Sequence, residues 1–158
     1  MSFSTKTRLQ VKYSGSFSSP LGEFQIYASD IGITKITIGE EEEPKGETNE
    51  LIGRAIDQLQ RYFAEELESF DIELDFQKTT NFQISVWKEL IKIPFGVTTS
   101  YQQIANNINN PKSVRAVGMA NGKNQIPIIV PCHRVINSNG NIGGYAWQPE
   151  VKVQKLKD

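Results

Sequence analysis

"SYQQIANNINNPKSVRAVGMANGKN", residues 100–124, decides how the second half of this 158-residue chain folds. Ser100 is followed three residues later by Gln103, which is the spacing of a capping box at the start of a helix. Asn110 is a candidate N-cap, and Pro111 suits the first position of a second helix, which small residues continue as far as "NGKN". Two short helices joined by "NNP" predict a helix-turn-helix.

The second of these helices carries little that could read a base sequence. A recognition helix in the major groove usually has long polar side chains, whereas this one has a single long cation, Arg115, among small residues. One interpretation is a shallow docking on phosphates or in a minor groove, with Arg115 inserted into the base stack. The other is tight helix packing inside the domain, with Arg115 in a surface ion pair. The small residues are Ser113, Ala116, Gly118 and Ala120.

Downstream, "IPIIVPCHRV" contains the only cysteine of the chain, Cys132, and its only histidine, His133. The apolar run 126–130 predicts a short buried strand that ends at Pro131. Neighbouring side chains of a strand point to opposite faces, so His133 reaches the thiol only if the chain bends or a water bridges them. Burial beside a cation or a proton acceptor would favour the reactive thiolate. The alternative is an inert buried cysteine beside an unrelated histidine.

Strand patterns dominate the first half of the chain. Stretches of β-formers lie between the turn signals "SSPLG" and "SDIG", which predicts a three-stranded antiparallel meander, followed by an amphipathic helix and a further strand. Helical patterns return in "NFQISVWKELIKI" and in "PEVKVQKLKD". The predicted strands cover residues 9–17, 22–29, 32–39 and 70–76, and the further predicted helices cover 47–67, 81–93 and 149–158.

These elements predict an α+β fold with two lobes. Residues 1–78 form a small N-terminal antiparallel-sheet lobe with a helix, and residues 79–158 form a mainly helical lobe with a helix-turn-helix and a short buried active-site strand. Charge divides in the same way. The first lobe holds 8 Lys and Arg against 15 Asp and Glu, a net charge of −7, and the second holds 9 against 3, a net charge of +6. A basic lobe is expected in a protein that binds a polyanion such as nucleic acid.

Composition excludes several classes of protein. No apolar run approaches the roughly 20 residues of a membrane-spanning helix, and the N-terminus lacks the apolar block of a signal peptide. A single cysteine cannot form an internal disulfide, which predicts a cytoplasmic protein with a free thiol. One cysteine and one histidine are too few for a structural zinc site of those residues, so no such metal site is expected. No cofactor is expected either, because the reaction predicted below does not require one.

"PCHRV" at 131–135, preceded by "RAVGMANGKNQIPIIV" and by "SYQQIA", resembles the signature of the O6-alkylguanine-DNA alkyltransferases, also called methylated-DNA-protein-cysteine methyltransferases. The resemblance covers the C-terminal lobe from about Asn81 to Lys155, and the N-terminal lobe is similar in outline, including "SPLGEF". It implies a ribonuclease H-like N-terminal lobe. It also implies a C-terminal lobe that binds duplex DNA containing O6-alkylguanine.

The resemblance implies roles for individual residues. Cys132 would accept the alkyl group, made nucleophilic by His133 acting through a water. Asn124 would orient the turn before the cysteine and help to hold the histidine and its water. Tyr101 would rotate the nucleotide out of the duplex and then hydrogen-bond the base. Arg115 would fill the gap that the extruded guanine leaves.

Further residues are implied at the DNA surface and in the guanine pocket. The DNA-contacting set is Tyr101, Ser113, Arg115, Ala116, Gly118 and Arg134. The pocket set is Pro127, Val130, Cys132, Tyr145 and Trp147. Bulky Trp147 would narrow the pocket and favour methyl over large adducts, unless it is a core residue.

This sequence departs from the family pattern near its end. The family has a glutamate late in the last helix, which completes a relay of cysteine, water, histidine and glutamate. Here that position falls one residue beyond Asp158. Asp158 could substitute for the glutamate, or the chain could be truncated. If neither holds, formation of the Cys132 thiolate would be weakened. Some relatives also bind zinc in the N-terminal lobe, for which this chain lacks the cysteines and histidines.

The predicted reaction is one irreversible transfer per molecule, because no hydrolytic route returns the thioether product to cysteine. The protein would act as a monomer, with cooperative binding along DNA left open, and would associate with the nucleoid in a prokaryote. Three alternatives belong to other classes. A lesion-binding relative would have replaced Cys132, a helix-turn-helix transcription factor would need sequence-reading side chains, and a cysteine hydrolase would need an oxyanion hole.

Overall fold

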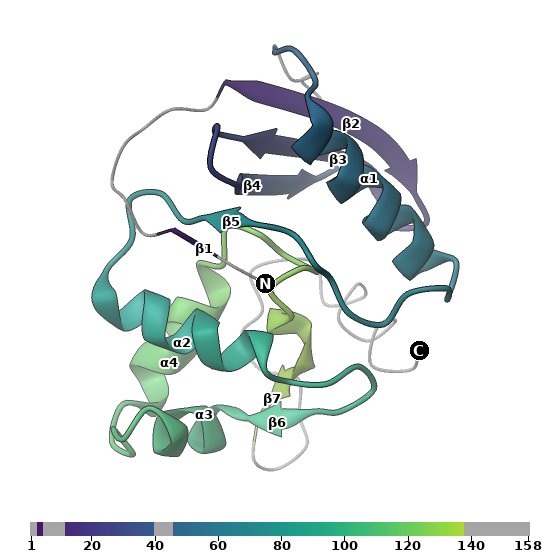
Figure 1. Ribbon diagram of the computed structural model, residues 1–158. Helices are drawn as coiled ribbons and strands as arrows, with labels where there is room; N and C mark the ends of the chain where they lie inside the picture. The colour runs from purple at the N-terminus through teal and green to yellow at the C-terminus, as the bar shows by residue number, and fades with distance from the viewer. Residues whose placement is uncertain (1–2, 5–11, 40–45, 138–158) are drawn as a thin grey trace. The chain divides into compact units, whose positions relative to one another are not determined.

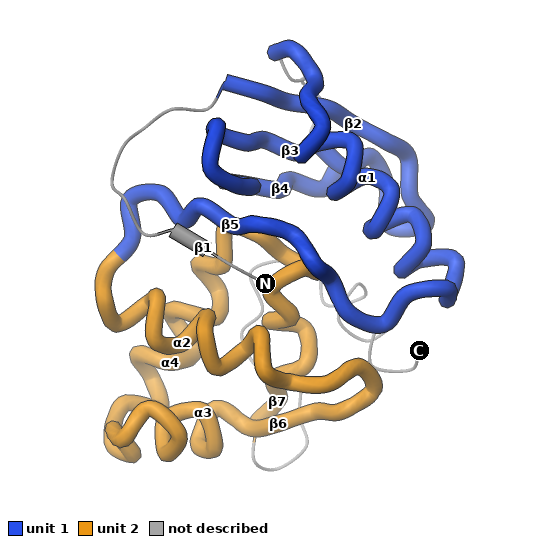
Figure 2. Tube along the Cα trace, in the orientation of Figure 1, with its two compact units in different colours: residues 1–79 blue, residues 80–158 orange. Residues whose placement is uncertain are grey.

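The computed structural model describes residues 3–4, 12–39 and 46–137 of the chain. The chain divides into two compact units, residues 1–79 and 80–158 (Figure 2), one residue from the predicted boundary. The first unit is a sheet with one helix and the second is mainly helical (Figure 1). The predicted α+β class is therefore confirmed.

The first unit is built on a five-stranded sheet with the order β1-β5-β4-β3-β2. One side of this sheet, with β2 at the edge, is the predicted antiparallel meander of β2, β3 and β4. Gly22, which opens β3 directly after the turn, has a φ of 113°, which a residue without a Cβ adopts at little cost. The strands are β1 (Phe3–Ser4), β2 (Tyr13–Ser19), β3 (Gly22–Ala28), β4 (Ile33–Ile38) and β5 (Leu74–Asp75).

The predicted strand 70–76 shrinks to the two residues of β5, which pair in parallel with β1 and β4. The alternating apolar residues of this segment point into the core although most of the segment is not a strand. The buried apolar residues are Phe70, Ile72, Leu74 and Phe76. Its backbone passes close to the start of β4. A Cβ on Gly32 would lie 2.7 Å from the carbonyl carbon of Leu74, so only glycine fits at this crossing.

Helix α1 (Glu50–Phe63) lies against the meander (Figure 1). It is shorter than the predicted 47–67, because Asn49 caps it by accepting a 2.9 Å hydrogen bond from the Ile52 backbone N–H. The helix approaches β2 closely, since a Cβ on Gly15 would lie 2.7 Å from Cγ2 of Ile52. The buried face of α1 consists of Ile52, Ala55, Leu59 and Tyr62.

The second unit begins with α2 (Asn81–Ile91), close to the predicted helix 81–93. Thr80 and Gln83 form a full capping box, with both hydrogen bonds at 3.1 Å. The indole N–H of the fully buried Trp87 donates to the Ala120 carbonyl at 2.9 Å. This bond ties α2 to α4 (Val114–Gly122), the second helix of the helix-turn-helix.

The first helix of that motif is α3 (Tyr101–Asn107), which packs against α4. Ser100 caps it by accepting a 3.0 Å hydrogen bond from the Gln103 N–H. The Gln103 side chain donates to Asn107 at 2.9 Å instead of returning to Ser100. The helix-turn-helix prediction is therefore confirmed, while the capping box predicted at Ser100 is only half formed.

Helix α4 begins later than predicted. Its N-cap is Ser113, so the prediction of Asn110 as N-cap with Pro111 at the first helical position was wrong. The two asparagines before Pro111 end α3 instead. Asn109 adopts a φ of 59°, and the Asn110 N–H donates to the Ala105 carbonyl at 2.9 Å. Asparagine often ends a helix by adopting the left-handed backbone conformation, as Asn109 does here.

The predicted strand at 126–130 was also wrong, because this run folds into a buried turn. The Val130 N–H donates to the Ile126 carbonyl at 3.0 Å, and Ile128 has a φ of 73°. A run that is buried on all sides carries no periodicity to distinguish a strand from a turn. After it come the 3-10 turn η1 (Cys132–Arg134) and β7 (Val135–Ile136), which pairs in parallel with β6 (Thr99–Ser100).

Some predictions fall outside the described residues, namely the helix at 149–158 and the roles of Tyr145, Trp147 and Asp158. Within the described ranges, no helix is long and apolar enough to cross a membrane. The same ranges hold no group of three or more His, Cys, Asp or Glu side chains placed to bind a metal ion.

Candidate active site

Cys132 opens the 3-10 turn η1 and has no exposed surface. Its backbone N–H donates to the Val130 carbonyl at 2.8 Å, so the chain bends sharply after the apolar run. His133 follows in the same turn and is 1% exposed. A 3-10 turn has about three residues per turn, so neighbouring side chains no longer point to opposite faces as they do in a strand. The bend that His133 needs to approach the thiol is present.

Asn124 closes the turn that carries the cysteine. Its side-chain N–H donates to the Val130 carbonyl at 2.8 Å, and its side-chain oxygen accepts from the Ile126 N–H at 3.0 Å. Pro127 is buried in this turn and forms a bridge to Val130. Because a buried asparagine satisfies backbone groups on both sides of the turn, the turn is held independently of any partner molecule.

Tyr101, the first residue of α3, is buried near Cys132 although the two are far apart in sequence. Burial raises the pKa of Tyr101 above 10.0, and the negative charge of the Cys132 thiolate raises it further, while a hydrogen bond from the Asn121 side chain opposes the shift. Tyr101 therefore stays a protonated hydrogen-bond donor at neutral pH.

Asn121, which sequence reasoning missed, links these two residues. It lies in the last turn of α4, is 1% exposed, and its side-chain N–H donates to the Cys132 carbonyl at 3.4 Å. One signal could have revealed it. Asn121 occupies the helical face of Val117 and Ala120, and a polar residue on the apolar face of a helix needs a buried partner.

The outer face of α4 carries Arg115 and Ala116, which are exposed, and Gly118, which is half-buried. A Cβ on Gly118 would meet nothing within 4 Å, so packing inside the protein does not require a glycine there. Ala120 is 3% exposed and faces inward. Each interpretation of the small residues therefore applies to some of them. Ala120 permits close packing inside the unit, whereas Ala116 and Gly118 leave the outer face of α4 without long side chains at their positions.

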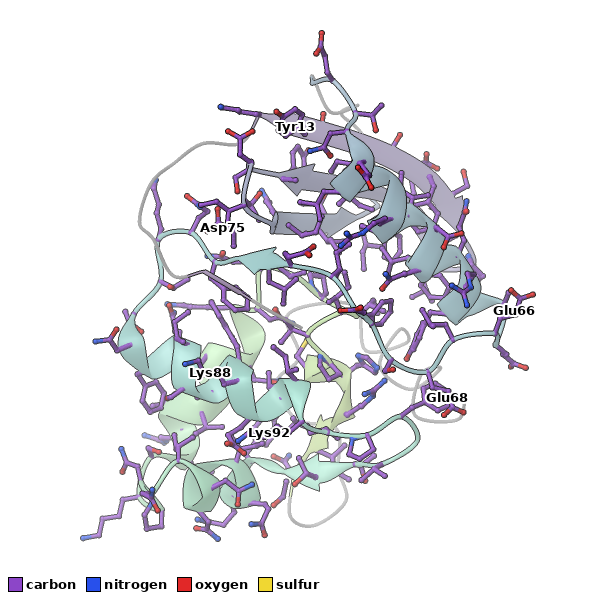
Figure 3. The ribbon with its side chains drawn as sticks, viewed as in Figure 1. Tyr13, Glu66, Glu68, Asp75, Lys88 and Lys92 are labelled. Carbon is purple, nitrogen blue, oxygen red and sulfur yellow. The ribbon has the colours of Figure 1, made fainter. Side chains whose placement is uncertain are left out.

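The surface around α4 is positively charged. Between residues 80 and 137, Glu89 is the single acidic residue against six Lys and Arg, and it pairs with Lys92 at 2.7 Å. Lys88 and Lys92 extend from α2 (Figure 3). In the described part of the chain no ion pair is formed by Lys112, Arg115 or Lys123. The surface ion pair considered for Arg115 is thus not observed.

Besides Tyr101, two residues of the predicted DNA-contacting set make internal hydrogen bonds. Arg134 is 8% exposed, and its guanidinium donates to the Ile93 carbonyl at 2.7 Å and lies 5.7 Å from the centre of the Phe95 ring. This internal bond argues against the predicted DNA contact and assigns Arg134 to the loop after α2. The Ser113 hydroxyl donates to the Asn110 carbonyl at 2.6 Å, although this side chain remains half-buried.

Comparison with known proteins extends over both units. Residues 81–158 match the family model described as "6-O-methylguanine DNA methyltransferase, DNA binding domain". Residues 12–76 match the one described as "6-O-methylguanine DNA methyltransferase, ribonuclease-like domain". A methylated-DNA-protein-cysteine methyltransferase of Methanosarcina acetivorans is 44% identical over 151 residues, covering 92% of this chain and 96% of that protein.

Two further relatives are similar over most of their length. The constitutive methylated-DNA-protein-cysteine methyltransferase of Bacillus subtilis is 41% identical over 155 residues, covering 90% of this chain and 92% of that protein. The crystal structure of Mycobacterium tuberculosis OGT in complex with DNA has a TM-score of 0.83 at 40% identity, covering 92% of this chain and 91% of that one.

Proposed function

The chain belongs to the methylated-DNA-protein-cysteine methyltransferase family, and we propose that it repairs DNA by moving the alkyl group of O6-alkylguanine onto Cys132. The observation that carries this proposal is the position of the only cysteine of the chain. Cys132 is fully buried on a turn braced by Asn124, and Tyr101 lies near it. An inert core cysteine would need none of these polar neighbours.

The transfer is a displacement at the alkyl carbon. His133, acting through a water, takes the thiol proton, and the Cys132 sulfur forms a bond to the carbon as the bond from carbon to O6 breaks. The electron pair of the broken bond stays on the guanine, which takes up a proton, and Tyr101 donates a hydrogen bond to the departing base. A thioether has no hydrolytic route back to a thiol, so each molecule reacts once.

The substrate base must leave the DNA stack before this chemistry can occur. An alkyl group on the guanine oxygen lies inside the duplex, and flipping a nucleotide costs a few kcal/mol, less for a damaged pair. Arg115 is the cation on the exposed face of α4, where Met119 is also exposed, and it would fill the gap that the base leaves. Exposed Ala116 and half-buried Gly118 let this helix approach the DNA closely.

DNA is the partner, and we propose that a monomer binds it mainly through phosphates. Lys112 lies just before α4, and Arg115 and Lys123 lie within it and at its C-cap. Their charges are not neutralised by carboxylates within the described ranges. Phosphate contacts position a protein on duplex DNA without reading its sequence, which suits a protein that must find a lesion in any sequence.

The test is label transfer from a duplex that contains one O6-methylguanine with a radioactive methyl group. We expect the label to reach a plateau at one methyl per protein molecule, located on the peptide of Cys132. Cys132→Ser is the matched control and should bind the duplex but take up no label. Tight binding without transfer by the unmodified protein would overturn the proposal and make the protein a lesion binder.

A further inference from the structure

The side chain of Asn121 uses its donors but not its acceptor. Its amide nitrogen donates to the Cys132 carbonyl at 3.4 Å and hydrogen-bonds Tyr101. Its amide oxygen is buried, and among the described residues it has no hydrogen-bond partner. The facing backbone carbonyl can only accept, which fixes the nitrogen on that side. The contacts of residue 121 therefore call for a side chain that donates hydrogen bonds. A side chain that only accepts them would not serve.

Asn121 contacts the two residues that are expected to carry the transfer reaction. The Cys132 carbonyl belongs to the turn that presents the sulfur, and the Tyr101 hydroxyl belongs to the residue expected to contact the base. A hydroxyl that accepts a hydrogen bond from Asn121 must direct its own proton elsewhere. Asn121 thus orients the Tyr101 donor away from α4 while it fixes the backbone of Cys132.

We propose that Asn121 is a positioning residue for alkyl transfer, which sets the direction of the Tyr101 hydroxyl and anchors the Cys132 carbonyl through its side-chain amide N–H groups. This inference rests on the proposed function, because the reaction that it serves is the transfer to Cys132. Its physical content is a pair of hydrogen bonds from one buried amide, and those bonds can be tested without any transfer.

Two variants separate a donor from a space-filling group. Asn121→Asp keeps the size and the acceptor but loses the amide donors at neutral pH, and Asn121→Leu loses both. The matched control is Thr34→Val in the first unit, which also replaces a buried polar side chain whose oxygen has no hydrogen-bond partner among the described residues. Thr34→Val should leave the transfer rate unchanged.

We expect both Asn121 variants to transfer methyl from duplex O6-methylguanine about tenfold more slowly, the factor that corresponds to one ordinary hydrogen bond. The deficit of Asn121→Asp relative to the unmodified protein should shrink as pH falls, because a protonated aspartate regains a donor. A residue that only fills space would leave Asn121→Asp near the unmodified rate, and that result would overturn the proposal.

A double-mutant cycle with Tyr101→Phe tests whether Asn121 acts through the hydroxyl. If it does, Asn121→Leu should slow transfer much less in the Tyr101→Phe background than alone. Fully additive losses would refute the link to Tyr101.

A last readout is independent of activity. In protein labelled with carbon-13 at the tyrosine Cζ atoms, the Tyr101 resonance should titrate at higher pH in Asn121→Leu, because the Asn121 hydrogen bond lowers the pKa of Tyr101. An unchanged Tyr101 titration would refute the contact. Absence of transfer in the unmodified protein would instead refute the proposed function, and the titration would still decide the role of Asn121.

Discussion

Single buried residues determine what the acceptor site can do. Asn124 and Asn121 donate to the backbone carbonyls of Val130 and Cys132, one on each side of the sharp bend. Buried polar groups that are satisfied in this way favour one backbone conformation, because each asparagine adds a second hydrogen bond to a carbonyl that already accepts one from the backbone of the turn. The thiol is thus held by asparagine side chains that do no chemistry themselves.

Arg115→Ala should separate base flipping from chemistry. We expect transfer from O6-methylguanine in duplex DNA to fall about 10- to 100-fold, since flipping costs a few kcal/mol, while transfer from the free base changes little. Lys88→Ala, which removes another exposed cation of the same unit, is the control and should affect the duplex reaction only weakly. Equal losses with duplex and free base would refute the role of Arg115.

The raised pKa of Tyr101 makes folding stability depend on alkaline pH. Between 10.0 and the higher pKa of the folded state, the unfolded chain loses the tyrosine proton first. The free energy of unfolding should therefore fall as pH rises above about 10. Urea titrations should show a shallower fall in Tyr101→Phe. A residual slope is expected from Tyr13, whose pKa is raised by its hydrogen bond to Asp30. An identical slope in the variant would contradict this account.

The sequence was a good guide to some of these residues and a poor one to others. Cys132 stands out because it is the only cysteine of the chain, and Arg115 because it is the only long cation among the small residues of its predicted helix. Asn121 did not stand out, since its partners are a backbone carbonyl and a tyrosine 20 positions away, and no local pattern encodes them. The internal hydrogen bond of Arg134 to the carbonyl of Ile93 was not foreseen either, and its predicted DNA contact stays a prediction.

At the scale of elements, periodicity and caps predicted the helices well, and buried or very short segments poorly. Helix α2 and the meander follow from their patterns and turn signals. The run 126–130 is apolar at every position, so its turn depends on the hydrogen bonds of Asn124, which lies outside the run. The two-residue strands β1 and β5 are defined by pairing with distant segments, β1 with β5 and β5 also with β4, which no local pattern reveals.

Gly118→Ala should have opposite effects on stability and on binding. The new Cβ meets nothing within 4 Å, and alanine is the better helix former, so the free energy of unfolding should rise by about 0.5–1 kcal/mol. Binding to duplex DNA should weaken, because the added methyl group holds the outer face of α4 away from the backbone. Denaturant titration and fluorescence anisotropy measure the two effects. Tighter or unchanged DNA binding would contradict the placement of this face on DNA.

At the scale of the whole molecule, charge is separated along the chain. The first 78 residues carry a net charge of −7 and the remainder +6, so the near-neutral total hides a basic unit that can attract DNA. The acidic unit repels the same partner. This division favours binding through the second unit.

Affinity for undamaged duplex should fall steeply with salt and depend little on sequence. Each phosphate contact contributes about −0.9 to the slope of log affinity against log salt concentration. Lys112→Ala and Lys123→Ala should each reduce the magnitude of that slope by about 1. Lys35→Ala in the first unit, which removes a cation lying 5.8 Å from the Tyr27 ring centre, should leave it unchanged. Binding that is insensitive to salt would contradict the phosphate-mediated docking.

The complete burial of Cys132 also bears on how long an unused molecule remains competent. A protein that reacts once has a single reactive thiol, and an oxidant or a small electrophile that reached this thiol would inactivate the protein. Thiol damage follows exposure. Burial therefore lowers the rate at which dissolved oxidants and small electrophiles consume the thiol before the protein meets a lesion.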